Sequence, residues 1–343
     1  RMCIDYRDLN SMTVADRYSL PRVDDCLNTL AGHRYFSAID MTSGYYVCEI
    51  DEASRQYTAF RTPDGDLMQW RSLPFGLRNS PAHYMRMMNA LFAGLTWRFM
   101  VLFVDDICIY SNTFDEHIEY LCQVFGRSRE GNIYMNPTKA YLMRDSVDFL
   151  GHTVTRDEIK PQTRLVDKLK RLGVPNTEKA VREWLGLAQF LAQYIKDYAK
   201  NTKGLRSLLK LPGTKYDEKT VRRANIESEI NLIIKTLEST GVLKIIDPGK
   251  PFVVECDGSV HGLGAVLYQP DENGKLWPVQ YASKTVSKTK KDRTQPQLEV
   301  MALLFALRKF RPHLIDKQFT VLTDHANTKH YLRNHDTLNW HMS

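Results

Sequence analysis

The chain has 343 residues, of which 43% are hydrophobic and 25% are charged, and its formal net charge is +7. These proportions are ordinary for globular proteins and leave room for two or three domains with sizeable cores. No run of about 18 apolar residues occurs, so we expect no membrane-spanning helix.

The first residues and the cysteines indicate the kind of polypeptide and the redox compartment to expect. The first residues carry no signal-peptide pattern and read like the middle of a strand, so we expect a piece of a longer polypeptide. The six cysteines are scattered without a CxxC pair. This spacing argues against a zinc site or a disulfide framework and indicates a reducing compartment.

The positive charge is concentrated in one segment. Between Lys160 and Arg223 there are 16 Lys or Arg residues against 6 Asp or Glu, an excess of ten. The remainder of the chain is therefore slightly acidic. A basic segment beside acidic clusters is typical of a protein that binds a polyanion and metal ions, although a solvated helical face would give the same count.

The first part of the chain alternates short β runs with helices. Residues 1–10 predict a strand that runs into a turn, and residues 19–30 predict a helix with a proline near its start. The β-rich run over residues 34–40 ends on a carboxylate, Asp40. Residues 58–70 predict a hairpin, because an Asp-Gly pair stands at its centre.

Two adjacent carboxylates, Asp105 and Asp106, stand between two apolar runs that favour β structure. The pattern predicts strands over residues 98–104 and 107–111, with both acids at the tight turn between them. Crowding two acids at an apolar tip costs repulsion and desolvation, which a divalent cation would offset. A solvated turn is the alternative, because Asp is a common turn residue.

Helices flank this hairpin and dominate the basic segment. We expect helices over residues 82–95 and 115–130, although the second one contains Gly126, and a glycine disfavours helix. The methionines of the first are interpreted as core residues. Beyond residue 160, apolar spacing and Pro and Gly punctuation predict three further helices, over residues 163–172, 178–198 and 218–240.

A second β-rich unit follows a Pro-Gly-Lys-Pro linker at residues 248–251. Asp257 and Asp324 each end a β run, and Glu299 lies on an apolar-faced helix over residues 297–310. A strand–helix–strand carboxylate trio suits metal-assisted hydrolysis of a phosphodiester. Each acid alone has another explanation, namely a turn, a solvated helix residue and an N-cap.

Asp40, Asp105 and Asp106 form a comparable set in the first part of the chain. All three lie at or just past the end of a β run, where side chains can converge on the rim of a sheet. Two-metal phosphoryl-transfer sites need such hard oxygen ligands, which hold two magnesium ions about 4 Å apart.

The chain resembles the reverse transcriptase and ribonuclease H region of a gypsy-type long-terminal-repeat retrotransposon Pol polyprotein. The resemblance covers nearly all of the chain. It rests on matching stretches in the following order: RMCIDYRDLN (1–10), SAIDMTSGY (37–45), TAFRTP (58–63), LPFGL (73–77), FVDD (103–106), FLGH (149–152), EWLGL (183–187), DGS (257–259) with GLGAV (262–266), and TDH (323–325).

This resemblance implies an α+β multidomain fold. It implies right-hand polymerase fingers and palm with an antiparallel sheet over residues 1–159, a basic helical thumb and connection over 160–247, and a ribonuclease H-like α/β domain over 248–343. It also implies further finger strands before Arg1 and a fourth ribonuclease H metal ligand after Ser343. Gly258 departs from the pattern, in which an Ala is commoner.

The resemblance also implies roles for individual residues. Asp40, Asp105 and Asp106 would hold two Mg²⁺, with Mn²⁺ as a substitute, and Asp257, Glu299 and Asp324 would be the ribonuclease H metal ligands. Tyr45 would be a steric gate against a 2′-hydroxyl. The other substrate contacts would be Arg1 at the triphosphate, Phe75 and Gly76 beside the nucleotide, Val104 near the primer end, Lys139 near the pyrophosphate, and Phe149, Leu150, Gly151 and His152 as the primer grip. Core packing is the alternative for Tyr45 and Phe75.

The function so implied is RNA-directed and DNA-directed DNA synthesis, with removal of RNA from RNA–DNA hybrids. Implied partners are an RNA template, a DNA or tRNA primer, the hybrid, dNTPs, and the protease and integrase regions of the same polyprotein. No membrane is implied, and both monomers and dimers fit. The implied localisation is the cytoplasm, within virus-like particles, or the nucleus. The alternatives are a nucleic-acid-binding or structural component without turnover, or a chain in which only the nuclease acts.

Overall fold

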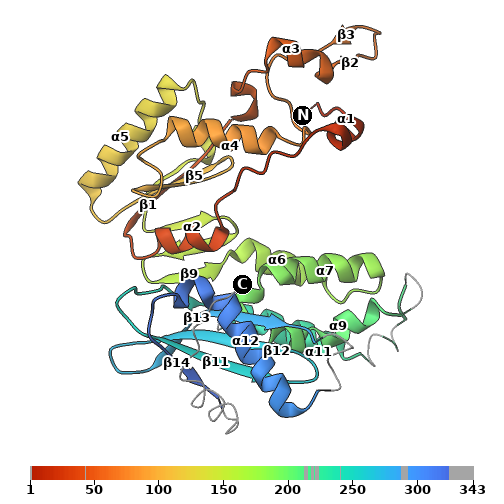
Figure 1. The fold of residues 1–343 in the computed structure, drawn as a ribbon, viewed down its shortest axis with the longest axis vertical. Helices are drawn as coiled ribbons and strands as arrows, with labels where there is room; N and C mark the ends of the chain where they lie inside the picture. The colour runs from red at the N-terminus through yellow and green to blue at the C-terminus, as the bar shows by residue number, and fades with distance from the viewer. Residues whose placement is uncertain are drawn as a thin grey trace. The chain divides into compact units, whose positions relative to one another are not determined.

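The computed structural model describes residues 2–42, 44–211, 215–217, 220, 224–239, 241–286 and 293–323. The chain divides into two compact units, Arg1–Asp157 and Glu158–Ser343 (Figure 1). Among the helices in these ranges, none is long and apolar enough to cross a membrane.

A four-stranded antiparallel sheet forms the centre of the first unit. Its strand order is β4-β5-β1-β6. The strands are β4 (Met100–Phe103), β5 (Asp106–Ser111), β1 (Tyr35–Asp40) and β6 (Tyr141–Arg144). In the register of β1 with β5, Tyr35 lies opposite Ser111 and Asp40 lies opposite Asp106. The acidic strand ends of the sequence therefore meet at one end of the sheet.

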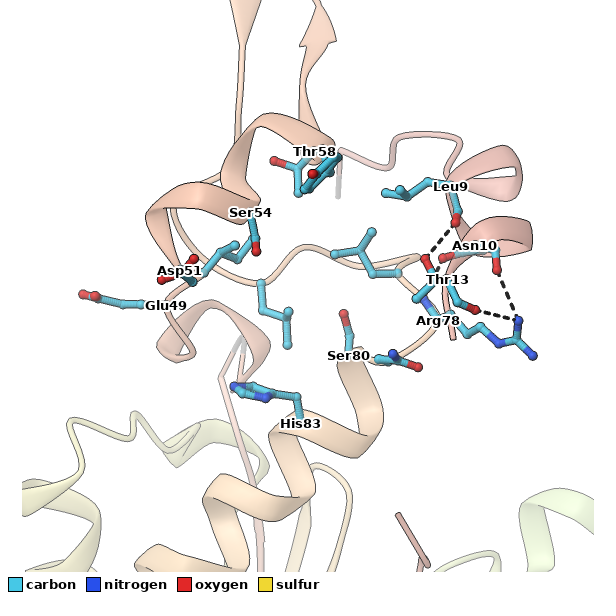
Figure 2. Close-up of a pocket in the computed structure, with 15 residues that line it drawn as sticks. Leu9, Asn10, Thr13, Glu49, Asp51, Ser54, Thr58, Arg78, Ser80 and His83 are labelled. Atoms are coloured by element: carbon cyan, nitrogen blue, oxygen red, sulfur yellow. Dashed lines mark hydrogen bonds between the residues drawn. The ribbon is translucent and has the colours of Figure 1, made fainter. Parts of the chain in front are cut away.

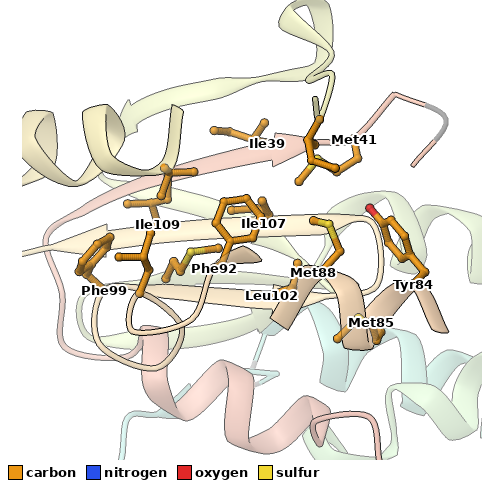
Figure 3. Packing of buried hydrophobic residues seen from close by; sticks show 14 of the residues in the cluster. Ile39, Met41, Tyr84, Met85, Met88, Phe92, Phe99, Leu102, Ile107 and Ile109 are labelled. Carbon is orange, nitrogen blue, oxygen red and sulfur yellow. The ribbon is translucent and has the colours of Figure 1, made fainter. Parts of the chain in front are cut away.

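Two helices, α4 (Ser80–Leu91) and α5 (Phe114–Glu130), share a hydrophobic core with this sheet. Met85 and Met88 of α4 are fully buried against the sheet residues Ile107 and Ile109 (Figure 3). The interpretation of these methionines as core residues is confirmed. A capping box at Thr113 starts α5, which runs unbroken through Gly126.

Shorter elements complete the first unit. They are α1 (Arg7–Met12), α2 (Val23–Leu30), η1 (Gly44–Val47), α3 (Glu52–Arg55), η2 (Gln56–Thr58), the hairpin of β2 (Phe60–Arg61) and β3 (Leu67–Met68), η3 (Pro137–Lys139), and the hairpin of β7 (Ser146–Phe149) and β8 (His152–Thr155). The strand predicted over residues 1–10 is wrong, because residues 2–6 form no strand and α1 follows. Tyr6 instead buries its ring and donates to the Thr58 carbonyl (3.2 Å).

The second unit contains another four-stranded sheet, in the order β13-β12-β11-β14. Its strands are β11 (Phe252–Gly258), β12 (Leu263–Pro270), β13 (Leu276–Lys284) and β14 (Phe319–Leu322). β14 runs parallel to β11 and the other pairs are antiparallel. The 20-residue helix α12 (Gln295–Leu314) packs its apolar face on the sheet.

The helical part of the second unit agrees only partly with the sequence prediction. Its elements are α6 (Thr163–Leu172), α7 (Glu178–Phe190), η4 (Ala192–Tyr194), α8 (Tyr198–Asn201), α9 (Lys203–Leu208) and α11 (Ile226–Ser239), together with the paired strands β9 (Glu158–Pro161) and β10 (Leu243–Lys244). The single helix predicted over residues 178–198 is wrong. Asp197 adopts a left-handed conformation (φ 54°), and the Ala199 amide then donates to Ser283 Oγ of β13 (2.9 Å). The segment after α7 packs on the sheet instead of continuing the helix.

Candidate active sites at the carboxylate-bearing strand ends

The hairpin between β4 and β5 places the first acids. Phe103 pairs with Asp106, so the two-residue turn consists of Val104 and Asp105. The predicted turn at Asp105 and Asp106 is thus wrong by one position, and Asp106 belongs to a strand. Val104 has φ 52°, a conformation that costs a β-branched residue about 1–3 kcal/mol. Its amide donates to Met85 Sδ (3.2 Å), which anchors the strained turn to α4.

Asp40 lies at the same end of the sheet. Directly opposite residues in an antiparallel pair have side chains on one face, about 5 Å apart, so Asp40 and Asp106 are neighbours. The Met41 amide donates to the Asp105 carbonyl (3.2 Å), which ties the turn to the end of β1. The Lys139 ammonium lies 2.8 Å from Asp40 Oδ2. The structure therefore brings Asp40, Asp105, Asp106 and Lys139 to one edge.

The donor set at this edge fits magnesium. Within the described ranges, no group of three His, Cys, Asp or Glu side chains forms a ready-made metal cage. Magnesium does not need one, because it is usually held by one or two carboxylates together with substrate phosphates and water. Asp40 with one acid of the hairpin supplies that number of hard oxygen ligands, and Lys139 balances the charge of Asp40 within the chain.

Aromatic rings pack beside the acids. The ring of Tyr45, in η1, lies 5.1 Å from the rings of both Phe75 and Tyr84. Burial raises the pKa of Tyr45 and of Tyr84, and the nearby charge of Asp105 raises both further. A Cβ added at Gly44 would collide with the Tyr84 hydroxyl, so the glycine makes room for this ring. Tyr84 was missed by sequence reasoning, because an aromatic on the buried face of a helix carries no signal beyond core packing.

Phe75 and Gly76 lie in the loop before α4. Gly76 has φ 97°, which favours glycine, and its carbonyl accepts from Asn10 Nδ2 (2.8 Å). Behind this loop lies a pocket of about 380 Å³ (Figure 2). Its walls come from α1, from residues 49–58 and from residues 73–83, and none of the predicted carboxylates lines it.

The predicted primer grip forms the turn between β7 and β8. Phe149 pairs with His152, and both Leu150 (φ 48°) and Gly151 (φ 83°) have positive φ, as in a type I′ turn. Phe149 and His152 are buried, at 3% and 1% exposure. Burial lowers the pKa of His152 to about 4. Only the two turn residues are thus partly open to solvent.

In the second unit, Glu299 contacts the main chain at Gly258, the residue that follows Asp257. Asp257 is exposed on β11, whereas Glu299 is 4% exposed on α12. The Gly258 amide donates to Glu299 Oε2 (3.3 Å), and Gln295 Nε2 donates to Glu299 Oε1 and to the Gly258 carbonyl (both 2.7 Å). A Cβ at Gly258 would collide with the Leu298 carbonyl, so this close approach leaves no room for a side chain.

One unexpected carboxylate lies near this site. Of the predicted residues, Asp324 of this site and Arg1 of the first unit lie outside the described residues. Asp197, which the sequence placed inside a helix, lies near Asp257. Burial raises the pKa of the Asp197 carboxyl, and the charge of Asp257 raises it further. A Cβ at Gly264 would collide with Asp197 Oδ1, so the carboxyl is seated directly on β12. Sequence reasoning missed Asp197 because the spacing of apolar residues does not report a left-handed residue that ends a helix.

Two family models match the chain. Residues 1–154 match the family described as reverse transcriptase (RNA-dependent DNA polymerase). Residues 247–343 match the RNase H-like domain found in reverse transcriptase. Over 95% of its length, the chain is 34% identical to the retrovirus-related Pol polyprotein from transposon 412 of Drosophila melanogaster and 34% identical to that from transposon 297. The chain belongs to the reverse transcriptase and RNase H-like region of long-terminal-repeat retrotransposon Pol polyproteins.

The chain spans about a quarter to a third of the length of the curated relatives that it matches. The chain spans 26% and 30% of the two Drosophila polyproteins, and 24% of the Transposon Tf2-3 polyprotein of Schizosaccharomyces pombe, to which it is 28% identical. Among solved structures, a foamy viral protease-reverse transcriptase in complex with double-stranded DNA is 25% identical with a TM-score of 0.84, over 97% of this chain and 57% of that one.

A second foamy viral structure, in complex with an RNA/DNA hybrid, is 26% identical with a TM-score of 0.79, over 94% of this chain and 43% of that one. Together with the family models, these likenesses confirm the predicted α+β multidomain fold.

Proposed function

We propose that the first unit is a DNA polymerase that copies RNA and DNA templates by metal-assisted nucleotidyl transfer. The observation that carries the proposal is the strand register that sets Asp40 opposite Asp106, with Asp105 in the adjoining turn. In a reverse transcriptase, this edge of the sheet is where a primer end and a dNTP would meet. Divalent metal use follows from the family.

The roles of the acids follow from their surroundings. Two Mg²⁺ held by Asp40, Asp105 and Asp106 would lower the pKa of the primer 3′-hydroxyl and neutralise the pyrophosphate that leaves. Lys139, 2.8 Å from Asp40, would offset the repulsion among the acids before substrate arrives and could then donate to the departing phosphates.

Tyr45 is proposed to select the sugar. Its ring is held between Phe75 and Tyr84, so it cannot yield to an added 2′-hydroxyl without disturbing both neighbours. Rigid packing of this kind turns a small steric difference into discrimination, because interiors are close-packed. Phe75 and Gly76 would border the base and the phosphates, Val104 the primer end, and Arg1 the triphosphate.

For the second unit we propose hydrolysis of RNA in RNA–DNA hybrids. Asp257 is open to solvent and Glu299 is held by two hydrogen bonds, so one acid is free to ligate and the other is fixed in place. Asp324 would complete the set. The excess of ten positive charges over residues 160–223 supports a thumb and connection that contact nucleic-acid phosphates. Assignment of the ranges 1–159, 160–247 and 248–343 to these three domains remains part of the proposal.

Primer extension on an RNA template with Mg²⁺ tests the polymerase. We expect extension by the chain and a loss on the order of 10³-fold in Asp105→Asn, because several kcal/mol of metal-dependent stabilisation disappear. Asp64→Asn, at the exposed turn between β2 and β3, is the matched control and should keep full activity. Extension that survives Asp105→Asn contradicts the site. A folded chain without extension favours a nucleic-acid-binding component.

A further inference from the structure

Helix α5 carries a second apolar face that stays exposed among the described residues. Its inner face is buried on the sheet and consists of His117, Leu121, Val124 and Ser128. Next to it lies an exposed row, which we term the α5 seam. The α5 seam consists of Asp115, Ile118, Cys122, Phe125 and Arg129. Ile118 and Phe125 are 43% and 41% exposed, and the Cys122 thiol is exposed as well.

The spacing and charge of the α5 seam are those of a helix that pairs with another helix. Its five residues follow one another at intervals of three, four, three and four, which is the a/d pattern of a coiled-coil face. The three central residues are apolar and the two ends carry opposite charges. Asp115 and Arg129 are both exposed, and neither has an ion pair within the described ranges.

Gly126 gives an independent reason to expect a neighbour. A glycine inside a helix costs about 1 kcal/mol relative to alanine. A Cβ built at Gly126 meets no atom of the described residues within 4 Å, so none of them requires a glycine at this position. The residue lies beside the α5 seam, next to Phe125. Close approach of a second helix backbone would use the space that a side chain would fill.

The α5 seam is complementary to itself in one orientation only. In an antiparallel pair with a two-fold axis beside Cys122, Asp115 faces Arg129 of the second copy, Ile118 faces Phe125 of the second copy, and the two Cys122 residues meet. A parallel pair would set Asp115 against Asp115 and Arg129 against Arg129. We infer that helix α5 is a self-association surface on which two copies of this chain pair antiparallel with two-fold symmetry.

The size of the surface sets the expected strength. From Asp115 to Arg129 the α5 seam is about 21 Å long, which is two heptads. Such a contact is smaller than the roughly 800 Å² per partner of a standard interface. We therefore expect a weak, reversible dimer that loosens as salt is added, because its terminal ion pairs are exposed.

Sedimentation velocity of the full chain over a concentration series, with mild oxidation and non-reducing gels, tests this inference. Cys3, the other exposed cysteine in the described ranges, is replaced by Ser in every sample. We expect a Cys122-linked dimer and a concentration-dependent dimer in solution. Ile118→Asp should abolish both, while thermal unfolding confirms that the variant is folded.

Exchanging the charges at the two ends of the α5 seam tests the antiparallel pairing most directly. Asp115→Arg or Arg129→Asp alone should weaken the dimer about tenfold, since each places like charges at both ends of the pair. Together the two changes restore opposite charges and should restore the dimer. Arg127→Glu, on the same last turn but away from the α5 seam, is the matched control and should have no effect. A chain that stays monomeric throughout, a dimer insensitive to Ile118→Asp, or a double swap that fails to rescue would each overturn the inference.

Discussion

The two candidate active sites use the same residue types but are assembled differently. In the first unit, Asp40 and Asp106 become neighbours through the register of two adjacent strands. In the second unit, Glu299 reaches the end of β11 only because α12 approaches the main chain at Gly258. Strand pairing fixes the first site locally, whereas packing of a helix on a sheet fixes the second. The second site therefore depends more on the integrity of its core.

Buried ionisable groups also differ between the units. In the first unit, burial lowers the pKa of three histidines, His33, His117 and His152. In the second unit, burial raises the pKa of two carboxyls, Asp197 and Glu229. Folding therefore disfavours protonation of these three histidines and favours protonation of these two carboxyls. Mild acid should separate the stabilities of the two units.

The largest expected effect separates the two chemistries. Asp257→Asn should reduce hybrid cleavage on the order of 10³-fold and leave primer extension unchanged, because the metal-binding oxygens lost belong to one site. Asp105→Asn should do the reverse. Both reactions are measured on one substrate, a labelled DNA primer on an RNA template. A variant that abolished both reactions while remaining folded would contradict the assignment of two independent sites.

The pH dependence of stability is expected to be strongest in the first unit. The pKa of His152 is about 4 when folded, against about 6.5 for an unperturbed histidine. The unfolded chain therefore takes up the proton first, and stability falls as the pH drops from about 6.5 towards 4. At 1.36 kcal/mol per pKa unit, the loss reaches about 3 kcal/mol.

Urea unfolding of the chain between pH 7 and 4.5, monitored by limited proteolysis within each unit, measures this loss. His152→Gln removes one titrating group and should reduce the decline for the first unit, leaving the part that His33 and His117 contribute. The second unit should weaken less over the same interval. Its folded state takes up protons on Asp197 and Glu229 more readily than the unfolded chain does, and this offsets the lowered pKa values of the Glu158 and Glu255 carboxyls. An equal decline in both units would show that the buried histidines are not the cause.

Gly258→Ala tests whether the second site depends on close packing. The added methyl group would collide with the Leu298 carbonyl and crowd the Glu299 amide, so α12 must shift. We expect a loss of about 2–3 kcal/mol in the stability of the second unit, together with loss of hybrid cleavage. Gly186→Ala is the matched control. A Cβ there meets no atom within 4 Å in the part of the chain that the structure describes, so this variant should stabilise α7 slightly. Two equally stable variants would mean that the strand and helix can separate without penalty.

The sequence predicted features that depend on local pattern. Helix α6 was predicted over its full range, because helical apolar spacing and the proline that follows at position 175 mark it. The hairpin that carries Asp105 was predicted as well, but its turn was placed one residue late. Turn position depends on which residues pair, and the pairing of Phe103 with Asp106 is a property of both strands.

Features that depend on distant contacts could not be predicted. The helix expected over residues 178–198 ends early because residues around Asp197 bind to β11, β12 and β13, and apolar spacing does not report on those contacts. The ion pair of Lys139 with Asp40 joins residues 99 positions apart. The resemblance to a family supplied a role for Lys139, whereas its partner came from the structure.

The smallest predicted effect concerns Tyr84, which links the acidic edge to the proposed sugar gate. Its ring packs edge-on against Tyr45, and burial followed by the nearby charge of Asp105 raises the pKa of its hydroxyl. Tyr84→Phe keeps the ring and removes only the hydroxyl. The hydroxyl is a polar group beside Asp105, and losing a polar interaction of about 1 kcal/mol corresponds to a roughly fivefold lower rate of extension. Selection against ribonucleotides should persist, because the Tyr45 ring remains supported. Single-turnover incorporation of a dNTP and of the matching rNTP measures both quantities, and a change in selection without a change in rate would assign the hydroxyl to the gate rather than to Asp105.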